Sequence, residues 1–436
     1  MTRVKKTQPL TAEEKLEQTL VPKSEHPYVI PENWVWTKLG CICEVQNGPN
    51  FSGLNFPYLD VKTLRGNKDF IFKSEGALVS PGSRVILVDG ENSGEVFLIN
   101  SEGYLGSTLR LLDFAAPNNA QFIEYFIAQH KDQLKKNKKG SAIPHLNKEI
   151  FYALSFPLPP LPEQRRIVSR IESLFEKLDH ARELVQAALD SFETRKAAIL
   201  HKAFNGELTA KWREKNGVKL ESWEYKQLEE VCISIYDGDH MAPPKREFGI
   251  PFLVISNINK GYVTFEETRF VPEDYYNSLS ETRTPQEGDL LYSIVGSFGI
   301  PAIVKENIKF CFQRHIALLR PDTKYLNYKC FWYIMQTQEI FNQVDSIATG
   351  TAQRTVPIRG LRKISFSFPS LLEQQEIVRT LDSLLEKEQH AKDKLEPILD
   401  QIDLMKKSIL ARAFRGELGT NDPSEENAIE LLKAML

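Results

Sequence analysis

Cysteine is scarce in this sequence. Five cysteines occur among 436 residues, at Cys41, Cys43, Cys232, Cys311 and Cys330. They form no CxxC pair, and no histidine stands at a spacing that suits zinc, which excludes a disulfide scaffold and leaves no zinc motif. We therefore expect reduced thiols in a cytoplasmic protein.

Long apolar runs are also missing. No stretch reaches the roughly 18 apolar residues that a membrane helix needs. The N-terminus carries Arg3, Lys5 and Lys6 and then several glutamates, where a signal peptide would have an apolar core. The expectation is a cytoplasmic location and no membrane partner.

Neither sign of charge is in clear excess. Lysine and arginine number 55 against 58 acidic residues, a net charge of -3. This balance gives no global sign of a nucleic-acid partner, so any anionic ligand has to be bound by local basic patches.

The usual motifs of catalysis and cofactor binding are absent. The sequence has no GxxxxGK[ST], GxGxxG, HExxH or GxSxG motif, and no Asn-Pro-Pro-aromatic tetrapeptide. Asp237, Asp239 and His240 come closest to a metal set, but the further ligands are missing, and a structured turn or recognition loop is the favoured interpretation. We predict no catalytic residue, no metal and no cofactor bound by this chain.

An internal repeat is the strongest positive signal. Residues 161–208 align without gaps on residues 371–418 at a constant shift of 210, and 21 of the 48 positions are identical. Two homologous segments of this length indicate a duplicated architecture.

Both copies predict long helices, because apolar residues recur at alternating steps of three and four. A sustained seam of this period needs a partner helix, so we expect the two copies to form an antiparallel coiled coil. The predicted seam residues are Ile167, Ile171, Leu174, Leu178, Val185, Phe192, Ile377, Leu381, Leu384, Leu395, Ile402 and Ile409.

The segments before each helix read as mixed α/β units. Strand-like runs at 84–88 and 290–295 are each followed by a glycine-containing turn, and a helical stretch follows later in each unit. The predicted fold class is α+β, with two globular domains joined and separated by the helix pair in a pseudo-two-fold repeat. The predicted segments are an N-terminal arm (1–30), a first domain (31–156), a central helix (157–210), a second domain (211–365), a distal helix (366–420) and a C-terminal tail (421–436).

Two basic stretches lie shortly before the long helices. One runs over 131–148 and the other over 354–363. Solvated charge runs are common, but lysine and arginine here can neutralise phosphates while neighbouring polar groups reach base edges or backbone. The candidate DNA-binding residues from these stretches are Lys135, Lys136, Lys138, Lys139, Ser141, His145, Asn147, Thr351, Gln353, Arg354 and Arg359.

Four segments carry a family resemblance: PLPPLPEQRRI at 157–167, LLEQQEI at 371–377, the paired AFxGEL endings at 203–208 and 413–418, and IPENWVW at 30–36. They resemble the DNA specificity subunit of type I restriction-modification systems, over roughly residues 31–419. The resemblance implies two target-recognition domains, each reading one half of a bipartite site. It also places Asp239, His240, Gln313 and Arg314 near double-stranded DNA.

The resemblance further implies a division of labour. The helices set the spacing and dock two methyltransferase subunits, and restriction and translocase subunits complete the complex. Adenine methylation and DNA cleavage, with S-adenosylmethionine, ATP and Mg, then belong to those partners and not to this chain. Two other interpretations stay open: a stand-alone DNA nuclease or methyltransferase, and a repeat scaffold that bridges proteins without binding DNA.

Overall fold

The chain forms two compact units. The computed structural model describes residues 12–138, 144–238, 243–351 and 353–436. Unit 1 comprises Met1–Leu184 and Ile398–Leu436, and unit 2 comprises Val185–Pro397. Each unit contains one globular domain and one end of each of two long helices, α6 (Leu161–Phe204) and α13 (Leu371–Phe414). The predicted α+β class with a duplicated domain and paired helices is confirmed.

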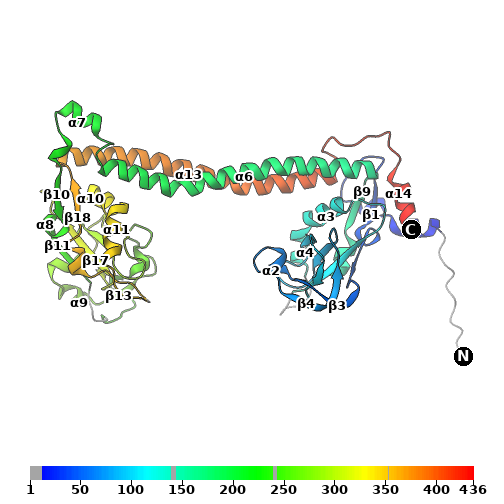
Figure 1. Ribbon diagram of the computed structural model, residues 1–436, viewed down its shortest axis with the longest axis horizontal. Coiled ribbons are helices and arrows are strands. Elements are labelled where there is room, and N and C mark those ends of the chain that lie inside the picture. Colours follow the sequence, from blue (N-terminus) through cyan, green and yellow to red (C-terminus); the bar gives the residue numbers. More distant parts are fainter. Residues whose placement is uncertain (1–11, 139–143, 239–242, 352) are drawn as a thin grey trace. The chain divides into compact units, whose positions relative to one another are not determined.

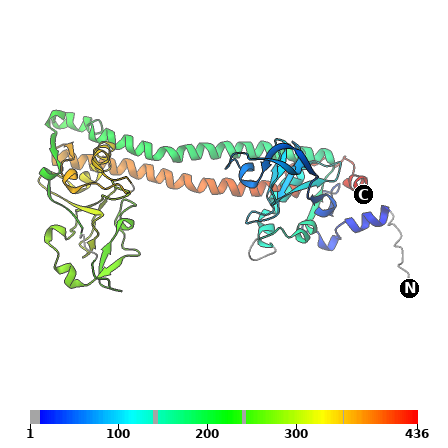
Figure 2. The same cartoon turned by 60° about the horizontal axis from the view of Figure 1, so that its bottom comes forward.

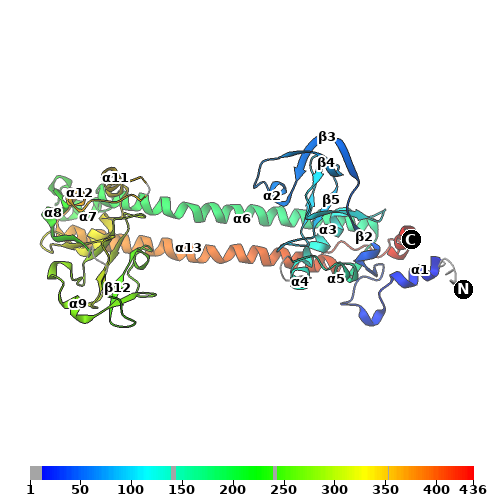
Figure 3. The same cartoon turned by 90° about the horizontal axis from the view of Figure 1, so that it is seen from below.

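Domain 1 is the globular part of unit 1. Its strands are β1 (Val35–Lys38), β2 (Cys43–Gln46), β3 (Asn50–Leu59), β4 (Phe72–Val79), β5 (Arg84–Leu87), β6 (Val96–Leu98), β7 (Gly103–Leu105), β8 (Leu109–Phe114) and β9 (Ser155–Leu158). The helices of unit 1 besides α6 and α13 are α1 (Ala12–Thr19), α2 (Val61–Leu64), α3 (Ala120–Gln129), α4 (Lys131–Lys136), α5 (Lys148–Ala153) and α14 (Ala428–Met435). The strands pair as β1-β9, as β2-β8-β5-β6, and as a closed set β3-β4-β7. Strands β3 and β4 lie on the side of the domain away from the helix pair (Figures 1 and 3).

Domain 2, the globular part of unit 2, repeats this plan. Its strands are β10 (Glu224–Gln227), β11 (Cys232–Asp237), β12 (Ile250–Leu253), β13 (Arg269–Val271), β14 (Leu290–Ser293), β15 (Pro301–Ile303), β16 (Cys311–Phe312), β17 (Ile316–Pro321) and β18 (Ser365–Phe368). Its helices are α7 (Ala210–Asn216), α8 (Leu228–Val231), α9 (Glu273–Asn277), α10 (Tyr328–Ile334), α11 (Gln338–Ile347) and α12 (Ile358–Leu361). The strand orders β10-β18 and β11-β17-β14-β15 match those of domain 1, and a sheet β13-β12-β16 completes the domain.

The long helices pack on the domains as well as on each other. In unit 1, Ile167 and Ile171 of α6 and Phe414 of α13 join the core of domain 1, where the rings of Phe126 and Phe414 lie 5.3 Å apart. In unit 2, Ile377 and Leu381 join the core of domain 2. Among the predicted seam residues, Ile167, Ile171, Phe192, Ile377, Leu381 and Ile402 are buried and Leu174, Leu178, Val185, Leu384, Leu395 and Ile409 are partly buried.

The two helices run antiparallel. In unit 1, Arg182 pairs with Asp403, and Lys406 Nζ lies 2.5 Å from Asp179 Oδ1, so moving forward along α6 means moving backward along α13. Figure 2 shows the helices side by side. The predicted pairing of the two repeat copies is thus confirmed.

One ion pair interrupts the apolar seam. In unit 2, Arg195 Nε donates to Glu388 Oε2 (2.8 Å), and both side chains are partly exposed. The positions 210 residues away from these two are Met405 and Leu178, an apolar combination. An ion pair in one half of the helix pair therefore corresponds to two apolar residues at the equivalent positions of the other half.

A buried carboxylate and amide anchor the start of α6. Glu163 and Gln164 are both 0% exposed. Trp34 Nε1 donates to Glu163 Oε2 (2.8 Å), and Asn421 Nδ2 donates to the same oxygen (2.8 Å). Gln164 Oε1 accepts from the backbone N of Asn119 (2.9 Å), just before α3. The helix start, the first strand and α3 are thereby held together.

The start of α13 is anchored in the same way with one added charge. Glu373 and Gln374 are also 0% exposed. Trp223 Nε1 donates to Glu373 Oε2 (3.1 Å), and Gln374 Oε1 accepts from the backbone N of Asn327 (2.8 Å), just before α10. Here Arg213 Nη1 also donates to Glu373 Oε1 (2.6 Å), so this buried carboxylate has a cationic partner.

The C-terminal tail is part of unit 1. Arg166 of α6 forms a two-pronged ion pair with Glu425 (2.8 and 2.9 Å), and the backbone N of Ala428 donates to Asn33 O (2.9 Å). Helix α14 lies beside α1 (Figure 1), with Leu432 fully buried. The segment that the sequence marks only as a tail closes the core of domain 1.

Two smaller expectations concern cysteines and membranes. All five cysteines lie in the described part of the chain, and none forms a disulfide. No helix among the described residues is long and apolar enough to cross a membrane.

Replacing the buried glutamate by glutamine should change the stability of the protein by different amounts at the two helix starts. Glu373→Gln leaves the Arg213 guanidinium, 9% exposed, without its carboxylate, and should lower the free energy of unfolding by about 3–5 kcal/mol. Glu163→Gln removes a buried charge that has no cation in direct contact, and should change it by no more than about 1 kcal/mol. Urea unfolding of the purified chain measures both, and equal losses for the two variants would contradict this account.

The pH dependence of Glu163 follows from its burial. Burial raises the pKa of the Glu163 carboxyl above its ordinary value of 4.5, and the hydrogen bonds from Trp34 and Asn421 offset only part of that effect. The native state then holds this proton more strongly, so the carboxyl's contribution to stability is lost as pH rises through the raised native pKa. The stability of Glu163→Gln relative to the unsubstituted chain should therefore increase from pH 4.5 upward, measured as the difference between their unfolding midpoints.

Candidate nucleic-acid interface

In domain 1, a predicted recognition loop is fastened to the turn after β5. The backbone N of Gly90 donates to Pro144 O (2.7 Å), and the backbone N of Leu146 donates to Val88 O (2.7 Å). Residues 144–146 of the first basic stretch are therefore held beside this turn.

Domain 2 fastens its loop in the same way to the turn after β14. The backbone N of Gly296 donates to Arg354 O (2.9 Å), and the backbone N of Val356 donates to Ile294 O (2.8 Å). Both domains thus share one backbone scaffold for a surface loop, and the side chains on that scaffold differ.

Two basic residues of the domain 1 loop contact acids of the adjoining turn. Lys138 Nζ donates to the backbone O of Glu91 (2.6 Å) and to its carboxylate (3.2 Å). His145 Nδ1 donates to Asp89 Oδ1 (2.6 Å). The turn at 89–94, which the sequence marks only as a glycine-rich connection, therefore places one carboxylate beside Lys138 and another beside His145.

The other candidates of domain 1 have varied surroundings. Lys135 and Lys136 lie on α4, where Lys136 is exposed and Lys135 partly buried. Asn147 caps α5, because its Oδ1 accepts from the backbone N of Ile150 (3.4 Å). Lys139 and Ser141 lie outside the described residues. Contact of these side chains with DNA stays a prediction.

A polar pocket in domain 2 brings together segments that are far apart in the sequence. It has a volume of about 280 Å³ and is lined by Asp237, Ile294, Val295, Arg314, His315, Gln353, Thr355, Val356, Pro357 and Ile358. Three predicted segments meet here: the end of β11, the turn between β16 and β17, and the loop after Gly350. Gly238 permits this meeting, because an added Cβ would overlap the backbone O of Phe312. Asp239 and His240 lie outside the described residues.

The basic residues near this pocket differ in whether they are paired with other groups of the domain. Arg354 Nη1 donates to Asp345 Oδ1 (2.6 Å), and its guanidinium lies 5.2 Å from the ring centre of Phe298. Burial and the nearby Arg314 charge lower the pKa of His315, which favours its neutral form. Arg314 itself is exposed.

The remaining candidates of domain 2 are also distributed. Thr351, Gln353 and Arg359 are exposed, and Arg359 lies on α12. Gln313 is partly buried, and its backbone N donates to Leu253 O (3.0 Å). The pocket therefore unites Arg314 and Gln353, while Thr351 and Arg359 do not line it.

Sequence reasoning missed several residues that shape these surfaces. Asp89 contacts His145, Glu91 pairs with Lys138, and His315 lines the polar pocket. Their signal is weak, because short acidic turns occur throughout soluble proteins. The paired EQ dipeptides at 163–164 and 373–374 are visible in the sequence as part of the internal repeat. Only their hydrogen-bond partners in the structure show that they anchor the helix starts.

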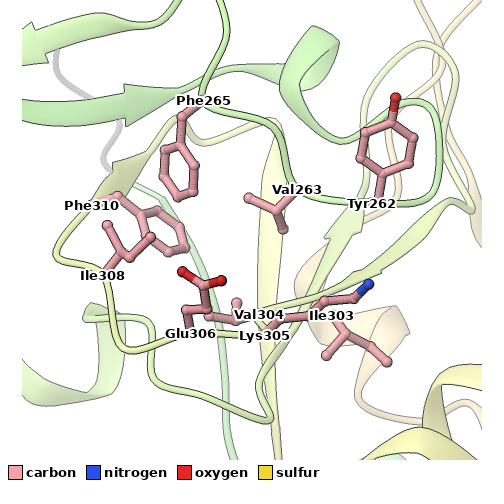
Figure 4. A pocket seen from close by; sticks show the side chains of 9 residues that line it. All are labelled: Tyr262, Val263, Phe265, Ile303, Val304, Lys305, Glu306, Ile308 and Phe310. Atoms are coloured by element: carbon pink, nitrogen blue, oxygen red, sulfur yellow. The ribbon is translucent and has the colours of Figure 1, made fainter.

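A second pocket of domain 2 is apolar. It has a volume of about 300 Å³ and is lined by Tyr262, Val263, Phe265, Ile303, Val304, Lys305, Glu306, Ile308 and Phe310 (Figure 4). The rings of Phe265 and Phe310 lie together, with their centres 5.6 Å apart. This lining suits an apolar group, and no predicted DNA-binding residue belongs to it. In the described part of the chain, no three His, Cys, Asp or Glu side chains are placed to hold a metal ion.

Comparison with known proteins gives a consistent family. A family model described as the type I restriction modification DNA specificity domain matches residues 31–186 and 221–398. The type I restriction enzyme MjaVIII specificity subunit of Methanocaldococcus jannaschii is 25% identical over 432 residues, which cover 91% of this chain and 95% of that protein. The EcoBI specificity subunit of Escherichia coli is 22% identical over 419 residues, which cover 89% and 87%.

Solved structures share the fold. A chain from a study of complex assembly and conformational transition in a type I R-M system matches with a TM-score of 0.69 and 21% identity, covering 90% of this chain and 100% of that chain. The crystal structure of the HsdS subunit from Thermoanaerobacter tengcongensis matches with a TM-score of 0.57, the same identity and the same coverage.

Removing a carboxylate from the acidic turn of domain 1 should increase the affinity of the protein for DNA. Glu91→Gln removes the carboxylate beside Lys138 and should raise the affinity for random-sequence duplex DNA about two- to fivefold. If Lys138 then contacts a phosphate, the slope of log affinity against log salt should steepen by about 0.9. Fluorescence anisotropy measures both quantities.

Glu102→Gln is the matched control, since Glu102 is an exposed acid elsewhere in domain 1. Lys135→Ala combined with Lys136→Ala should act in the opposite direction and weaken binding. Equal gains for Glu91→Gln and Glu102→Gln would mean that only net charge matters and would contradict the local pairing.

Proposed function

This chain belongs to the type I restriction modification DNA specificity family, and from that premise we propose that it selects the DNA site of a type I restriction-modification complex. Each domain reads one half of a bipartite double-stranded site. The observation that carries this proposal is the duplicated loop scaffold with different side chains, since two halves of different sequence need one geometry and two surfaces.

The surfaces of the two domains support separate specificities. Domain 1 offers Lys138 and His145 beside the acids Glu91 and Asp89. Domain 2 offers a pocket with an arginine, an amide, a carboxylate and an imidazole. Base edges in the major groove present distinct donor and acceptor patterns, so these two sets are suited to different base pairs.

The helix pair has a mechanical role in this proposal. Each of α6 and α13 has 44 residues, which at a rise of 1.5 Å per residue corresponds to about 66 Å. The buried Glu–Gln anchors fix each domain to its end of the pair, and the pair sets the distance between half-sites. The same helices offer docking surface to two methyltransferase subunits.

The chemistry belongs to partner subunits. Methyltransferase subunits bind S-adenosylmethionine and methylate adenine, and restriction and translocase subunits use ATP and Mg for movement and cleavage. This chain contributes the choice of site and no catalytic group. The DNA substrates of the complex are the cell's own DNA and DNA that enters the cell. The complex therefore acts in the cytoplasm.

A methylation experiment tests the proposal. The chain is expressed with its cognate modification subunits in a host that lacks adenine methylation, and genomic DNA is sequenced for modified bases. We expect adenine methylation at one bipartite motif, and no methylation or cleavage by the purified chain alone. Turnover by the isolated chain would favour a stand-alone enzyme, and a complex that assembles without binding DNA would favour a scaffold.

The spacing role predicts a change in the motif itself. Deleting residues 181–187 and 397–403 removes about 10 Å from both helices, and the preferred gap between half-sites should shorten by about three base pairs at 3.4 Å each. A plasmid library with gaps of every length reports the preference by methylation. Inserting seven residues at the same places should lengthen the gap, and an unchanged gap in both variants would refute the spacing role.

A further inference from the structure

We propose that Arg314 reads a guanine in the half-site bound by domain 2. This inference rests on the proposed function and deepens it, because it names one residue and the base that it recognises.

The backbone around Arg314 is held on both sides. The turn is the three-residue connection between β16 and β17, and the backbone N of Ile316 donates to Gln313 O (3.0 Å). The backbone N of Gln313 donates to Leu253 O (3.0 Å), which ties the turn to β12. Gly238 packs against the same turn so closely that a Cβ there would overlap it. An exposed side chain on such a rigid base is well placed for a geometrically demanding contact.

Other cations near the pocket are already engaged within the domain. Arg354 pairs with Asp345 and lies over Phe298. Arg362 Nη2 donates to Ile235 O (2.8 Å). In the part of the chain that the structure describes, the Arg314 guanidinium has no hydrogen bond or ion pair of its own. It is therefore available to a ligand at the pocket.

The position of domain 1 that is equivalent to Arg314 carries no cation. Leu109 pairs with the last residue of β5, and Ile316 pairs with the last residue of β14, so β8 and β17 are in equivalent register. Two residues before these positions stand Ser107 and Arg314. A side chain that differs between the domains is suited to reading a base, because the two half-sites differ in sequence whereas their phosphates do not.

The chemistry of the side chain selects guanine. The guanidinium has a planar fork of donors that matches the O6 and N7 acceptors of guanine in the major groove, and this is the commonest specific contact of arginine with DNA. The neighbouring His315 favours the neutral form, so it adds no competing positive charge. Gln353 lines the same pocket and offers a neutral hydrogen-bonding group to the adjacent base pair.

The test uses the complex of the chain with its modification subunits and duplexes that carry the methylation motif. Each guanine of the motif is replaced in turn by 7-deazaguanine, which lacks the N7 acceptor. For the unsubstituted complex, one replacement in one half-site should weaken binding roughly tenfold. For the Arg314→Ala complex, the same replacement should have no effect, while binding to the unmodified motif falls about 5- to 150-fold.

Two further variants make the outcome specific. Arg314→Lys keeps the charge but not the fork, so it should relax the motif at the same single position. Lys260→Ala removes an exposed cation of domain 2 that neither lines the pocket nor belongs to the predicted DNA-binding residues, and it should leave the motif unchanged. Thermal unfolding checks that all three variants fold, which is expected because both side chains are exposed.

The results that overturn the inference are distinct from those that overturn the proposed function. A bipartite motif that is unchanged in Arg314→Ala, or a loss of affinity that is equal for all duplexes, assigns Arg314 to the phosphate backbone and sinks the inference alone. A motif whose half-sites contain no G·C pair does the same. Absence of any bipartite motif from the unsubstituted complex sinks the proposed function.

Discussion

A buried carboxylate at the start of each long helix is the constraint on which both units depend. Glu163 and Glu373 are fully buried, and a carboxylate in such a place is tolerated only where donors surround it. The donors come from a tryptophan that precedes the first strand of the domain and from residues that follow the end of the other helix. Each unit therefore has one point at which a helix start, a helix end and a domain must meet.

The two copies satisfy this constraint differently. Glu373 is met by Arg213, whereas Glu163 is met by neutral groups of Thr420 and Asn421 as well as by Trp34. The same contrast recurs at Arg195 with Glu388, whose counterparts in the repeat are apolar. Duplication has preserved where groups meet and has let their chemistry diverge. The recognition loops follow this rule too, with equal backbone bonds and unequal side chains, and this is how one architecture can support two specificities.

Much of the fold could be predicted from the sequence, and the reasons are local. The seam of the helices is visible because a helix repeats every 3.6 residues, and the strand before each glycine turn is visible because β-rich runs and turns alternate. The roles of individual polar residues were less accessible. Asn147 stands in a basic stretch and caps a helix, and Lys138 stands in the same stretch and is paired with Glu91, 47 residues away. No spacing rule relates such partners, because the fold brings them together.

The sequence by itself determined the duplication, the antiparallel pairing of the helices and the α+β character of the domains. The internal repeat indicates the duplication, and the periods of the apolar residues indicate the helices and strands. Only the tertiary structure decided that the C-terminal tail completes domain 1, that Asp89 and Glu91 contact His145 and Lys138 of the basic loop, and that Arg314 shares a pocket with Gln353. The physical reason is that the charge a side chain presents to a ligand depends on which groups lie within a few ångströms of it. Those groups come from segments that are distant along the chain.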